Sequence, residues 1–398
     1  MLSGHVVARL AGGGGANVVA SALGIESDRY ETWIFGGDRE GEDALWDAAA
    51  AGGVRIVVSP GMGPGRGLAD VAALLRLIRL LRTERFTIVH THSRKAGIIG
   101  GIAARLCRVP VIVHSFHTRV FRGIARTPPY GRVEPFVRRL AHAHIAVSPG
   151  VARQAVEARA ARPGRITVVA SGVDLAGIPR GFDPDARRAL GVPSDVTLIG
   201  TVGRIASEKA HTDFVRMASQ VRRTHSATAF VLIGDGPLAS SVRNLAADLG
   251  IELIMTGHRA DAARLCAGFD VFVMTSIREG LGRALVEALA SARPCVATAV
   301  DGVPDLVAHG VTGLLVAPGD PAAAVRAVHW MIDNPPDATQ LGRSGRSRVR
   351  HAHSPFTIEA MCASIDRCYQ SMLGLPEEIA QPPGGTGLTT GKETKSGA

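Results

Sequence analysis

Short runs of apolar, often β-branched residues alternate with longer helical patterns along most of the chain, and after a looser span the alternation starts again. Strands of this kind are uniformly apolar because they are buried on both faces, and strand–helix repeats build parallel sheets covered by helices. The sequence therefore predicts an α/β protein with two Rossmann-like, doubly wound parallel-sheet domains. In the first half the predicted strands are His5–Leu10, Thr32–Gly36, Val54–Val58, Phe86–His90, Pro110–His114, Ala143–Val147 and Ile166–Val169.

The looser span, Leu175–Ser194, contains three prolines and predicts the connection between the domains. We expect a first domain at residues 1–178, a second at 179–354, and a last helix at 355–375 that packs back on the first domain. Residues 376–398 have the composition of a disordered tail. Because ligands of such sheets bind beyond the carboxyl ends of the strands, the two domains are expected to face one cleft.

Composition excludes several classes of protein. Hydrophobic residues make up 46% of the chain and charged residues 20%, which is typical of a globular protein. No apolar run reaches the roughly 18–20 residues that cross a bilayer, and no basic segment followed by an apolar one marks a secretory signal. The five cysteines form no C-x-x-C pair, so we expect apolar filler in a reducing compartment. A cytoplasmic protein is predicted.

The formal net charge of +10 is concentrated in the first half of the chain. Between Arg105 and Arg139 there are eight arginines and one acidic residue, Glu134. This excess favours an acidic partner, such as anionic lipid headgroups at the inner face of the plasma membrane or a phosphorylated acceptor. The alternative is an arginine-rich composition without function. Nucleic acid is disfavoured, because only 4% of residues are aromatic and no recognition module is present.

One segment of the second half, Thr275–Glu287, follows a predicted strand and opens a predicted helix. Gly280 and Gly282 let the backbone approach a ligand, and amides at a helix start favour an anion. Glu287 lies about 7 Å further along the helix at roughly 1.5 Å per residue, near the distance from a nucleotide phosphate to its ribose. The alternative is a solvated glutamate on an ordinary helix.

A second segment places Arg204 and Lys209 just after the strand Val196–Val202. Two cations at the edge of the cleft could neutralise a diphosphate without a metal. The alternative is a pair of solvated surface cations. The D-x-D formed by Asp183 and Asp185 lies in the connector, where helix capping is favoured over metal binding.

In their order and spacing these segments resemble the large GT-B family of retaining glycosyltransferases, family GT4. The resemblance extends from about His5 to Tyr369. It is carried by E-x7-E at Glu279 and Glu287, by G-R-x4-K at Arg204 and Lys209, and by Ile233–Pro237, Asp301–Asp305 and Gly310–Val316.

The resemblance implies a role for each matching residue. Glu279 would lie against the transferred sugar, and Glu287 would bind the ribose of the donor. Arg259, within Thr256–Arg259, would meet the base. The diphosphate would be held by Arg204 and Lys209 with the backbone of Gly282, Arg283 and Ala284, and a glycine turn at Gly13 and Gly14 would approach the donor phosphates and the acceptor.

In the first half, the segment Pro110–Thr118 resembles the family's strand and loop with a histidine near the anomeric carbon, a role that falls to His117. His92 and Lys95 are candidates for the acceptor side. His90 and His92 could ligate a metal by their spacing, but with no third ligand expected nearby we predict no metal site.

Two departures from the family are visible. The family often has Gly-Gly-x-x-Glu where this chain has Asp301–Asp305, which ends on a shorter carboxylate. Few residues precede the glycine run, so the first strand is expected to be short, with either a misassigned start codon or a trimmed edge strand as the reason.

The function that this resemblance implies is transfer of a sugar with retention, from a nucleotide diphosphate donor such as UDP-GlcNAc to a hydroxyl. The acceptor would be a lipid-linked saccharide or a small molecule, and no cofactor would be required. Two alternatives stay open: a nucleotide-sugar 2-epimerase of the same layout, and a nucleotide-sugar-binding protein without turnover.

Overall fold

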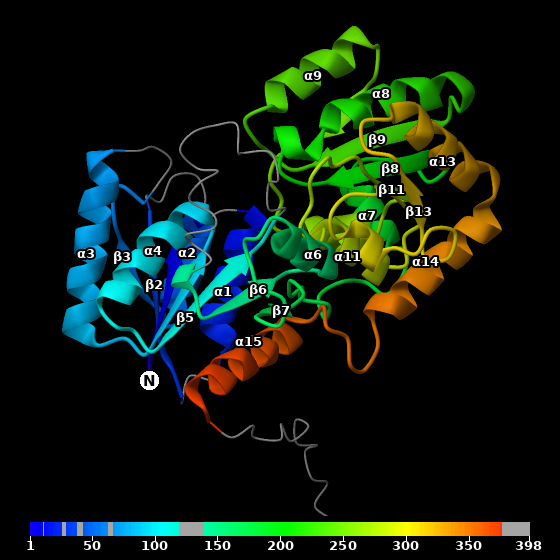
Figure 1. Ribbon diagram of the computed structural model, residues 1–398. Helices are drawn as coiled ribbons and strands as arrows, with labels where there is room; N and C mark the ends of the chain where they lie inside the picture. The colour runs from blue at the N-terminus through cyan, green and yellow to red at the C-terminus, as the bar shows by residue number, and fades with distance from the viewer. Residues whose placement is uncertain (11, 26–28, 38–42, 63–66, 119–138, 376–398) are drawn as a thin grey trace, which may run out of the picture.

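The computed structural model describes residues 1–10, 12–25, 29–37, 43–62, 67–118 and 139–375. Within these residues there are two sheets, and every strand pair in them is parallel. Helices cover both faces of each sheet (Figure 1). The predicted fold class, two doubly wound α/β units, is confirmed. The predicted tail at 376–398 lies outside the described residues.

The first sheet has seven strands in the order β3-β2-β1-β4-β5-β6-β7. β1 pairs with β2 on one side and β4 on the other, so it is a central strand. The expectation of a trimmed edge strand is therefore wrong, and the strand predicted from His5 already begins at Leu2. The strands are β1 Leu2–Val7, β2 Glu31–Gly36, β3 Arg55–Val58, β4 Ile88–His92, β5 Val111–Phe116, β6 Ala143–Ala146 and β7 Ile166–Val168.

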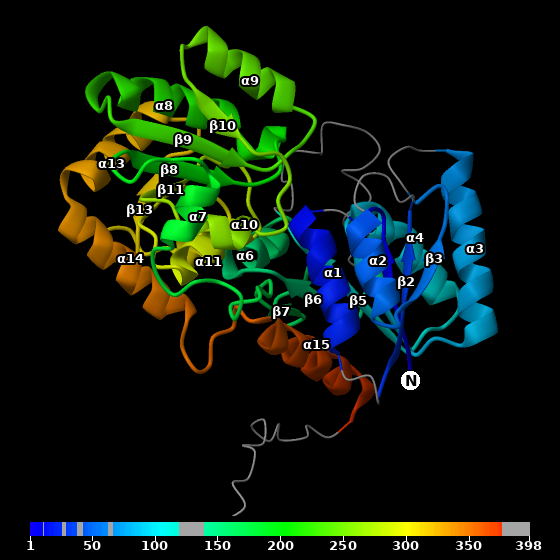
Figure 2. The same ribbon diagram turned by 180° about the vertical axis from the view of Figure 1, so that it is seen from behind.

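Alternate residues of these strands pack against different helices. Val6, Val89 and Ile112 face α3 and α4, whereas Val7 and Ile34 face α1 and α2. Figure 2 shows α1 and α2 on the face opposite to α3 and α4. The helices of this part are α1 Gly12–Gly24, α2 Asp43–Ala51, α3 Leu68–Glu84, α4 Arg94–Leu106 and α6 Pro149–Glu157.

The second sheet has six strands in the order β10-β9-β8-β11-β12-β13. Its core is also divided into one cluster on each face. The strands are β8 Thr197–Val202, β9 Thr228–Ile233, β10 Leu253–Met255, β11 Val271–Met274, β12 Cys295–Thr298 and β13 Leu314–Val316. The helices are α7 Pro184–Ala189, α8 His211–Thr224, α9 Ala239–Asp248, α10 Ala262–Cys266, α11 Arg283–Ala290, α12 Val303–Leu306, α13 Pro321–Asp333 and α14 Pro335–Val349, with a 3₁₀ turn at Ser207–Lys209.

Both sheets reverse their strand order at one point, between β1 and β4 and between β8 and β11. In doubly wound sheets this switch point leaves a crevice at the carboxyl ends of the strands, where ligands bind. Asp183 caps α7 by accepting hydrogen bonds from the amides of Asp185 and Ala186, so the predicted capping role of the D-x-D is confirmed.

The last helix, α15 (Ile358–Leu373), returns to the first sheet and lies beside α1 (Figures 1 and 2). Its buried residues Met361, Ile365 and Tyr369 share a core cluster with Ile88 of β4 and Val111 of β5. The helices on this face of the first sheet thus include α1, near the start of the described chain, and α15, at its end.

Candidate functional site

The loops that follow β8 and β11 meet at the switch point of the second sheet. The Lys209 ammonium forms an ion pair with the Glu279 carboxylate, and the Ser276 hydroxyl donates a hydrogen bond to the same carboxylate oxygen at 3.2 Å. Asp301, after β12, accepts a hydrogen bond from the Glu279 amide at 2.9 Å. Two residues predicted from separate motifs are therefore in direct contact, and Ser276 and Asp301 hold the loop of Glu279 in place.

Arg204 is less constrained than Lys209. It lies 3.9 Å from Glu208, and its side chain is 44% exposed. Lys209 and Arg204 are both predicted to hold a diphosphate. Lys209 is in direct contact with its carboxylate partner, whereas Arg204 lies at the outer limit of an ion pair. An entering diphosphate would have to take Lys209 away from Glu279, whereas Arg204 could turn toward it at little cost.

Helix α11 begins at the predicted anion site. Gly282 precedes it with φ 90°, a left-handed conformation that favours glycine. Glycine has no side chain to cap the first amides of the helix. Gly282, Arg283 and Ala284 therefore form a helix start beside Glu279, as the sequence predicts.

Glu287 lies one turn further along α11 and is partly buried. Burial raises the pKa of its carboxyl to about 7, and the nearby Arg283 opposes this shift. A carboxyl in such a place gains from polar hydroxyl groups that replace its lost hydration.

Arg259 is held by a different partner. Its guanidinium makes two hydrogen bonds of 2.8 Å to Asp261, and both side chains are about 40% exposed. It follows β10, the outermost strand on that side of the sheet. The structure therefore does not bring Arg259 into contact with Lys209 or Glu279.

The first domain contributes His117, which directly follows β5. Its Nε2 lies 2.9 Å from Nδ1 of His92, at the end of β4. A side chain at Gly14 would contact the His117 ring at 3.8 Å. Gly12–Gly15 form the first turn of α1, so the glycine turn predicted at Gly13 and Gly14 is the start of a helix. At the start of α1, as at Gly282 before α11, glycines leave the backbone uncovered by side chains next to a predicted site residue.

His117 also lies against the second domain. A Cβ at Gly280 would be 2.1 Å from the His117 carbonyl oxygen, which leaves room only for glycine. The peptide next to Glu279 therefore contacts His117 directly. In this way the structure joins the two residues that the resemblance assigns to the sugar.

Lys95 does not belong to this contact. Its ammonium lies 2.7 Å from Asp70 and joins the starts of α4 and α3. Of the two predicted acceptor-side residues, only His92 contacts His117.

Sequence reasoning missed a set of hydrogen bonds between the domains at the start of α6. The Ser148 hydroxyl donates to the Gly280 carbonyl at 2.9 Å, and the Gly150 amide donates to Asp305 at 2.5 Å. Gln154 donates to Asp301 at 2.9 Å. The departure at Asp301–Asp305 thus supplies carboxylates that hold α6. Ser148 followed by proline is an N-cap signature that indicates the start of α6, but it carries no signal for these contacts with the second domain.

A third histidine also corrects the sequence interpretation. His5, His90 and His92 offer ring nitrogens that all lie within 4.8 Å of one another, so His90 and His92 do have a third candidate ligand nearby. The geometry fits a metal poorly. Both nitrogens of His90 are used, by Tyr369 and Ser115 at 2.7 Å each. His5 and His92 face each other at 3.0 Å in nearly parallel planes, so their nitrogens point at one another rather than at a common centre.

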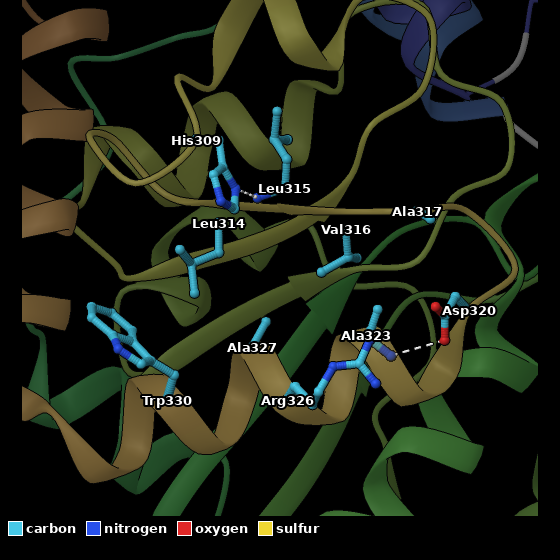
Figure 3. A pocket seen from close by; sticks show the side chains of 10 residues that line it. All are labelled: His309, Leu314, Leu315, Val316, Ala317, Asp320, Ala323, Arg326, Ala327 and Trp330. Atoms are coloured by element: carbon cyan, nitrogen blue, oxygen red, sulfur yellow. Dashed lines mark hydrogen bonds between the residues drawn. The ribbon is translucent and has the colours of Figure 1, made fainter.

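A separate hollow lies on the outer side of the second sheet, between β13 and α13 (Figure 3). Apolar residues, Asp320 and Arg326 line it, and His309 accepts a hydrogen bond from the amide of Leu315 at 3.0 Å. It contains none of the predicted site residues.

Two family descriptions match the chain. Residues 11–176 match "Glycosyltransferase Family 4" and residues 182–348 match "Glycosyl transferases group 1". A D-inositol 3-phosphate glycosyltransferase of Mycobacterium bovis is 32% identical over 94% of this chain and 82% of its own length. The UDP-Gal:alpha-D-GlcNAc-diphosphoundecaprenol alpha-1,3-galactosyltransferase of Escherichia coli is 28% identical over 67% of this chain and 72% of its own length.

Solved structures share the fold. HepE of Anabaena in complex with UDP-glucose has a TM-score of 0.80 at 20% identity, and the match covers 93% of this chain and 100% of HepE. WaaG, described as a glycosyltransferase involved in lipopolysaccharide biosynthesis, has a TM-score of 0.73 at 12% identity, over 94% of this chain and 100% of WaaG.

Proposed function

The chain belongs to glycosyltransferase family 4 and has the GT-B fold, and from this premise we propose that it moves a sugar from a UDP-sugar to an acceptor hydroxyl with retained anomeric configuration. The observation that carries the proposal is that the loop of the Lys209–Glu279 pair contacts the backbone of His117 through Gly280, at the carboxyl ends of strands from both sheets. One site then contains a cation for the leaving diphosphate, Lys209, and a neutral ring for the sugar, His117.

On the donor side, departure of the diphosphate needs positive charge that is already in place. We assign Arg204, Lys209 and the start of α11 to the phosphates, and Glu287 to the ribose. Lys209 would leave Glu279 for the phosphate, which frees the Glu279 carboxylate to stabilise a cationic, oxocarbenium-like sugar. Arg204 and Lys209 would stabilise the leaving diphosphate without a metal or a cofactor.

Around the sugar, His117 would contribute a neutral imidazole, because burial lowers its pKa to about 4. A neutral ring hydrogen-bonds to sugar oxygens, whereas an imidazolium would repel a cationic sugar and compete with it for the Glu279 carboxylate. We assign no protein nucleophile; the departing phosphate would take the acceptor proton on the same face.

We assign the acceptor to phosphate-bearing molecules, a lipid-linked saccharide or a phosphorylated polyol. The relatives act on a diphosphoundecaprenol-linked sugar and on inositol 3-phosphate, and both acceptors are anionic. No helix among the described residues has the length and apolarity needed to cross a membrane. Access to a lipid carrier would instead use the exposed face of α3, where Leu68, Val71 and Leu75 lie beside Arg79 and Arg82.

The test is a donor screen. Purified protein is incubated with UDP-GlcNAc, UDP-glucose or GDP-mannose and each acceptor class, with and without EDTA, while nucleotide release and products are measured. We expect UDP release that depends on the acceptor and withstands EDTA. An epimerised nucleotide sugar without an acceptor would support the epimerase alternative, and binding without any product the non-catalytic one.

A further inference from the structure

Three histidines form a continuous hydrogen-bonded chain from the centre of the first sheet to the junction of the domains. Nδ1 of His5 lies 3.0 Å from Nε2 of His92, and Nδ1 of His92 lies 2.9 Å from Nε2 of His117. The two outer nitrogens, Nε2 of His5 and Nδ1 of His117, are buried and have no partner among the described residues. The row of histidines therefore has two ends, one in the centre of the sheet and one beside Gly14.

All three rings are neutral near pH 7. Burial lowers the pKa of His5 and of His117 to about 4 and that of His92 well below its ordinary value. The groups that act on these rings are other buried histidines, not carboxylates. Each ring therefore carries one N–H, and each of the two hydrogen bonds needs one.

Only two arrangements of protons satisfy both hydrogen bonds. In the first, every ring is protonated on Nδ1: His5 donates to His92, His92 donates to His117, and Nδ1–H of His117 is left over. In the second, every ring is protonated on Nε2, and Nε2–H of His5 is left over. A change at either end requires all three rings to change together.

Burial distinguishes the two arrangements. An orphaned N–H costs more in a protein interior than an orphaned lone pair. His5 is fully buried in the centre of the sheet, whereas His117 is partly exposed. Nδ1 of His117 is itself covered, so either arrangement leaves one buried N–H without a partner. The first arrangement places this N–H at the junction of the domains, where the substrate is expected, and leaves only a lone pair in the centre of the sheet.

We propose that His5 and His92 are positioning residues that hold His117 in its Nδ1–H tautomer, so that His117 presents a hydrogen-bond donor to an oxygen of the bound sugar. This inference rests on the proposed function. It adds His5 to the site and gives His92 a positioning role without substrate contact, in place of the expected acceptor-side role. The deep histidine of β1 and the histidine of β4 act only through the ring of His117.

The first measurement needs no substrate. In protein labelled with ¹⁵N at histidine, ring nitrogen shifts report which nitrogen of His117 carries the proton. We expect Nδ1–H in the wild type at pH 7. In His5→Phe, where His92 loses its donor, we expect a mixture of tautomers at His117. Nε2–H in the wild type would overturn the proposal, and so would a stoichiometric metal bound to His5 and His92.

The second measurement separates positioning from packing. Asn at position 92 keeps an amide nitrogen near the place of Nδ1 and can still donate to His117, whereas Phe cannot. We expect His92→Phe to lower kcat at least tenfold with less than threefold change in donor KM, and His92→Asn to retain a third or more of wild-type kcat. Equal loss in both variants would contradict the proposal.

His114→Phe is the matched control. His114 is a buried imidazole on β5 that is hydrogen-bonded to Thr91 at 2.8 Å. Among the described residues it makes no hydrogen bond to His5, His92 or His117. We expect His114→Phe to change Tm about as much as His92→Phe does, but to keep kcat within threefold of the wild-type value. If no donor supports turnover but His117 carries its proton on Nδ1, the proposed function fails and the tautomer assignment stands.

Discussion

The two domains bring opposite kinds of chemistry to the place where they meet. From the second domain come charged groups in exchangeable pairs: Lys209 with Glu279, and Arg204 with Glu208. From the first come buried neutral rings in a fixed chain, of which His117 is the end. Ion pairs near the surface can change partners when a ligand enters, whereas buried hydrogen-bonded rings cannot without leaving polar atoms unpaired. A mobile charged side and a rigid neutral side suit a reaction in which a diphosphate leaves and a sugar must stay oriented.

The largest effect should come from the charged side. Lys209→Ala removes the cation that faces the leaving diphosphate and leaves the Glu279 carboxylate without its partner. We expect kcat/KM in the UDP-release assay to fall by about 10³, at the upper end for loss of one oriented charge-stabilising group. Lys209→Arg should recover at least a tenth of the wild-type value. If Ala and Arg at this position behave alike, positive charge is not what Lys209 contributes.

The next largest effect should come from separating the two sides. Gly280→Ala would place a Cβ 2.1 Å from the His117 carbonyl oxygen. The loop or the domains must then move, and a displacement near 1 Å can cost about 10² in rate. Gly181→Ala is the control, because a Cβ there would meet no atom within 4 Å. A Gly280→Ala enzyme with wild-type kcat would show that this contact is not needed for turnover.

A third prediction concerns charge on the outer face of the first domain. Arg79→Gln with Arg82→Gln removes two basic residues from the exposed face of α3. At about 1 kcal/mol for each basic residue near an anionic surface, partition onto vesicles with 30% phosphatidylglycerol should fall roughly 30-fold, and by less in high salt. Vesicle sedimentation measures this. The double variant Arg326→Gln, Arg343→Gln makes the same charge change in the second domain and should bind as wild type; equal loss in both would point to net charge alone.

The smallest effect should be the pH response of Glu287. Because its pKa is raised to about 7, the carboxylate is lost as pH falls through 7. If the ionised form binds the ribose, donor KM should rise up to about tenfold between pH 7.5 and 6. Glu287→Gln should have a high KM without this pH dependence. The same pH dependence of KM in the Gln variant would assign the titration to another group.

The ionised form of Glu287 is expected to favour donor binding, but it destabilises the fold. A carboxyl whose folded pKa is raised above its unfolded value stabilises the fold only while protonated, so this contribution is present below about pH 4.5 and is lost as pH rises through about 7. Glu287→Gln should therefore raise Tm more at pH 8 than at pH 5. A thermal melt at the two pH values checks this without any substrate.

Local patterns in the sequence predicted every strand of the first sheet, but they predicted more of the candidate site in the second domain than in the first. The helix start at Gly282, the cap at Asp183 and the contact of the Lys209 and Glu279 motifs follow from turn chemistry and from strand order. The glycine run at Gly12–Gly15 did not predict a helix, because glycine has low helix propensity and only packing against the sheet overrides it. Helix α14 likewise contains Gly342, which has low helix propensity but is needed because a Cβ there would lie 2.3 Å from the Ala292 carbonyl oxygen.

The histidine chain could not be predicted in this way. His5 and His92 are 87 positions apart, and they meet because β1 pairs with β4 in a register that sets His5 beside His90. That register depends on the whole crossover between the strands, which no local motif encodes. The coupling of α6 to Asp305 depends on the relative position of the two domains and was equally out of reach.

The return of α15 to the first sheet has a consequence for biosynthesis. Tyr369 donates or accepts the hydrogen bond that fixes His90, and Met361 and Ile365 cover strands made long before. At roughly 5–20 residues per second, the ribosome needs about 10–40 seconds to travel from the end of the first sheet to α15. During that interval one apolar surface of the nascent chain is uncovered, so early release or premature termination before α15 should leave a product that aggregates or recruits chaperones.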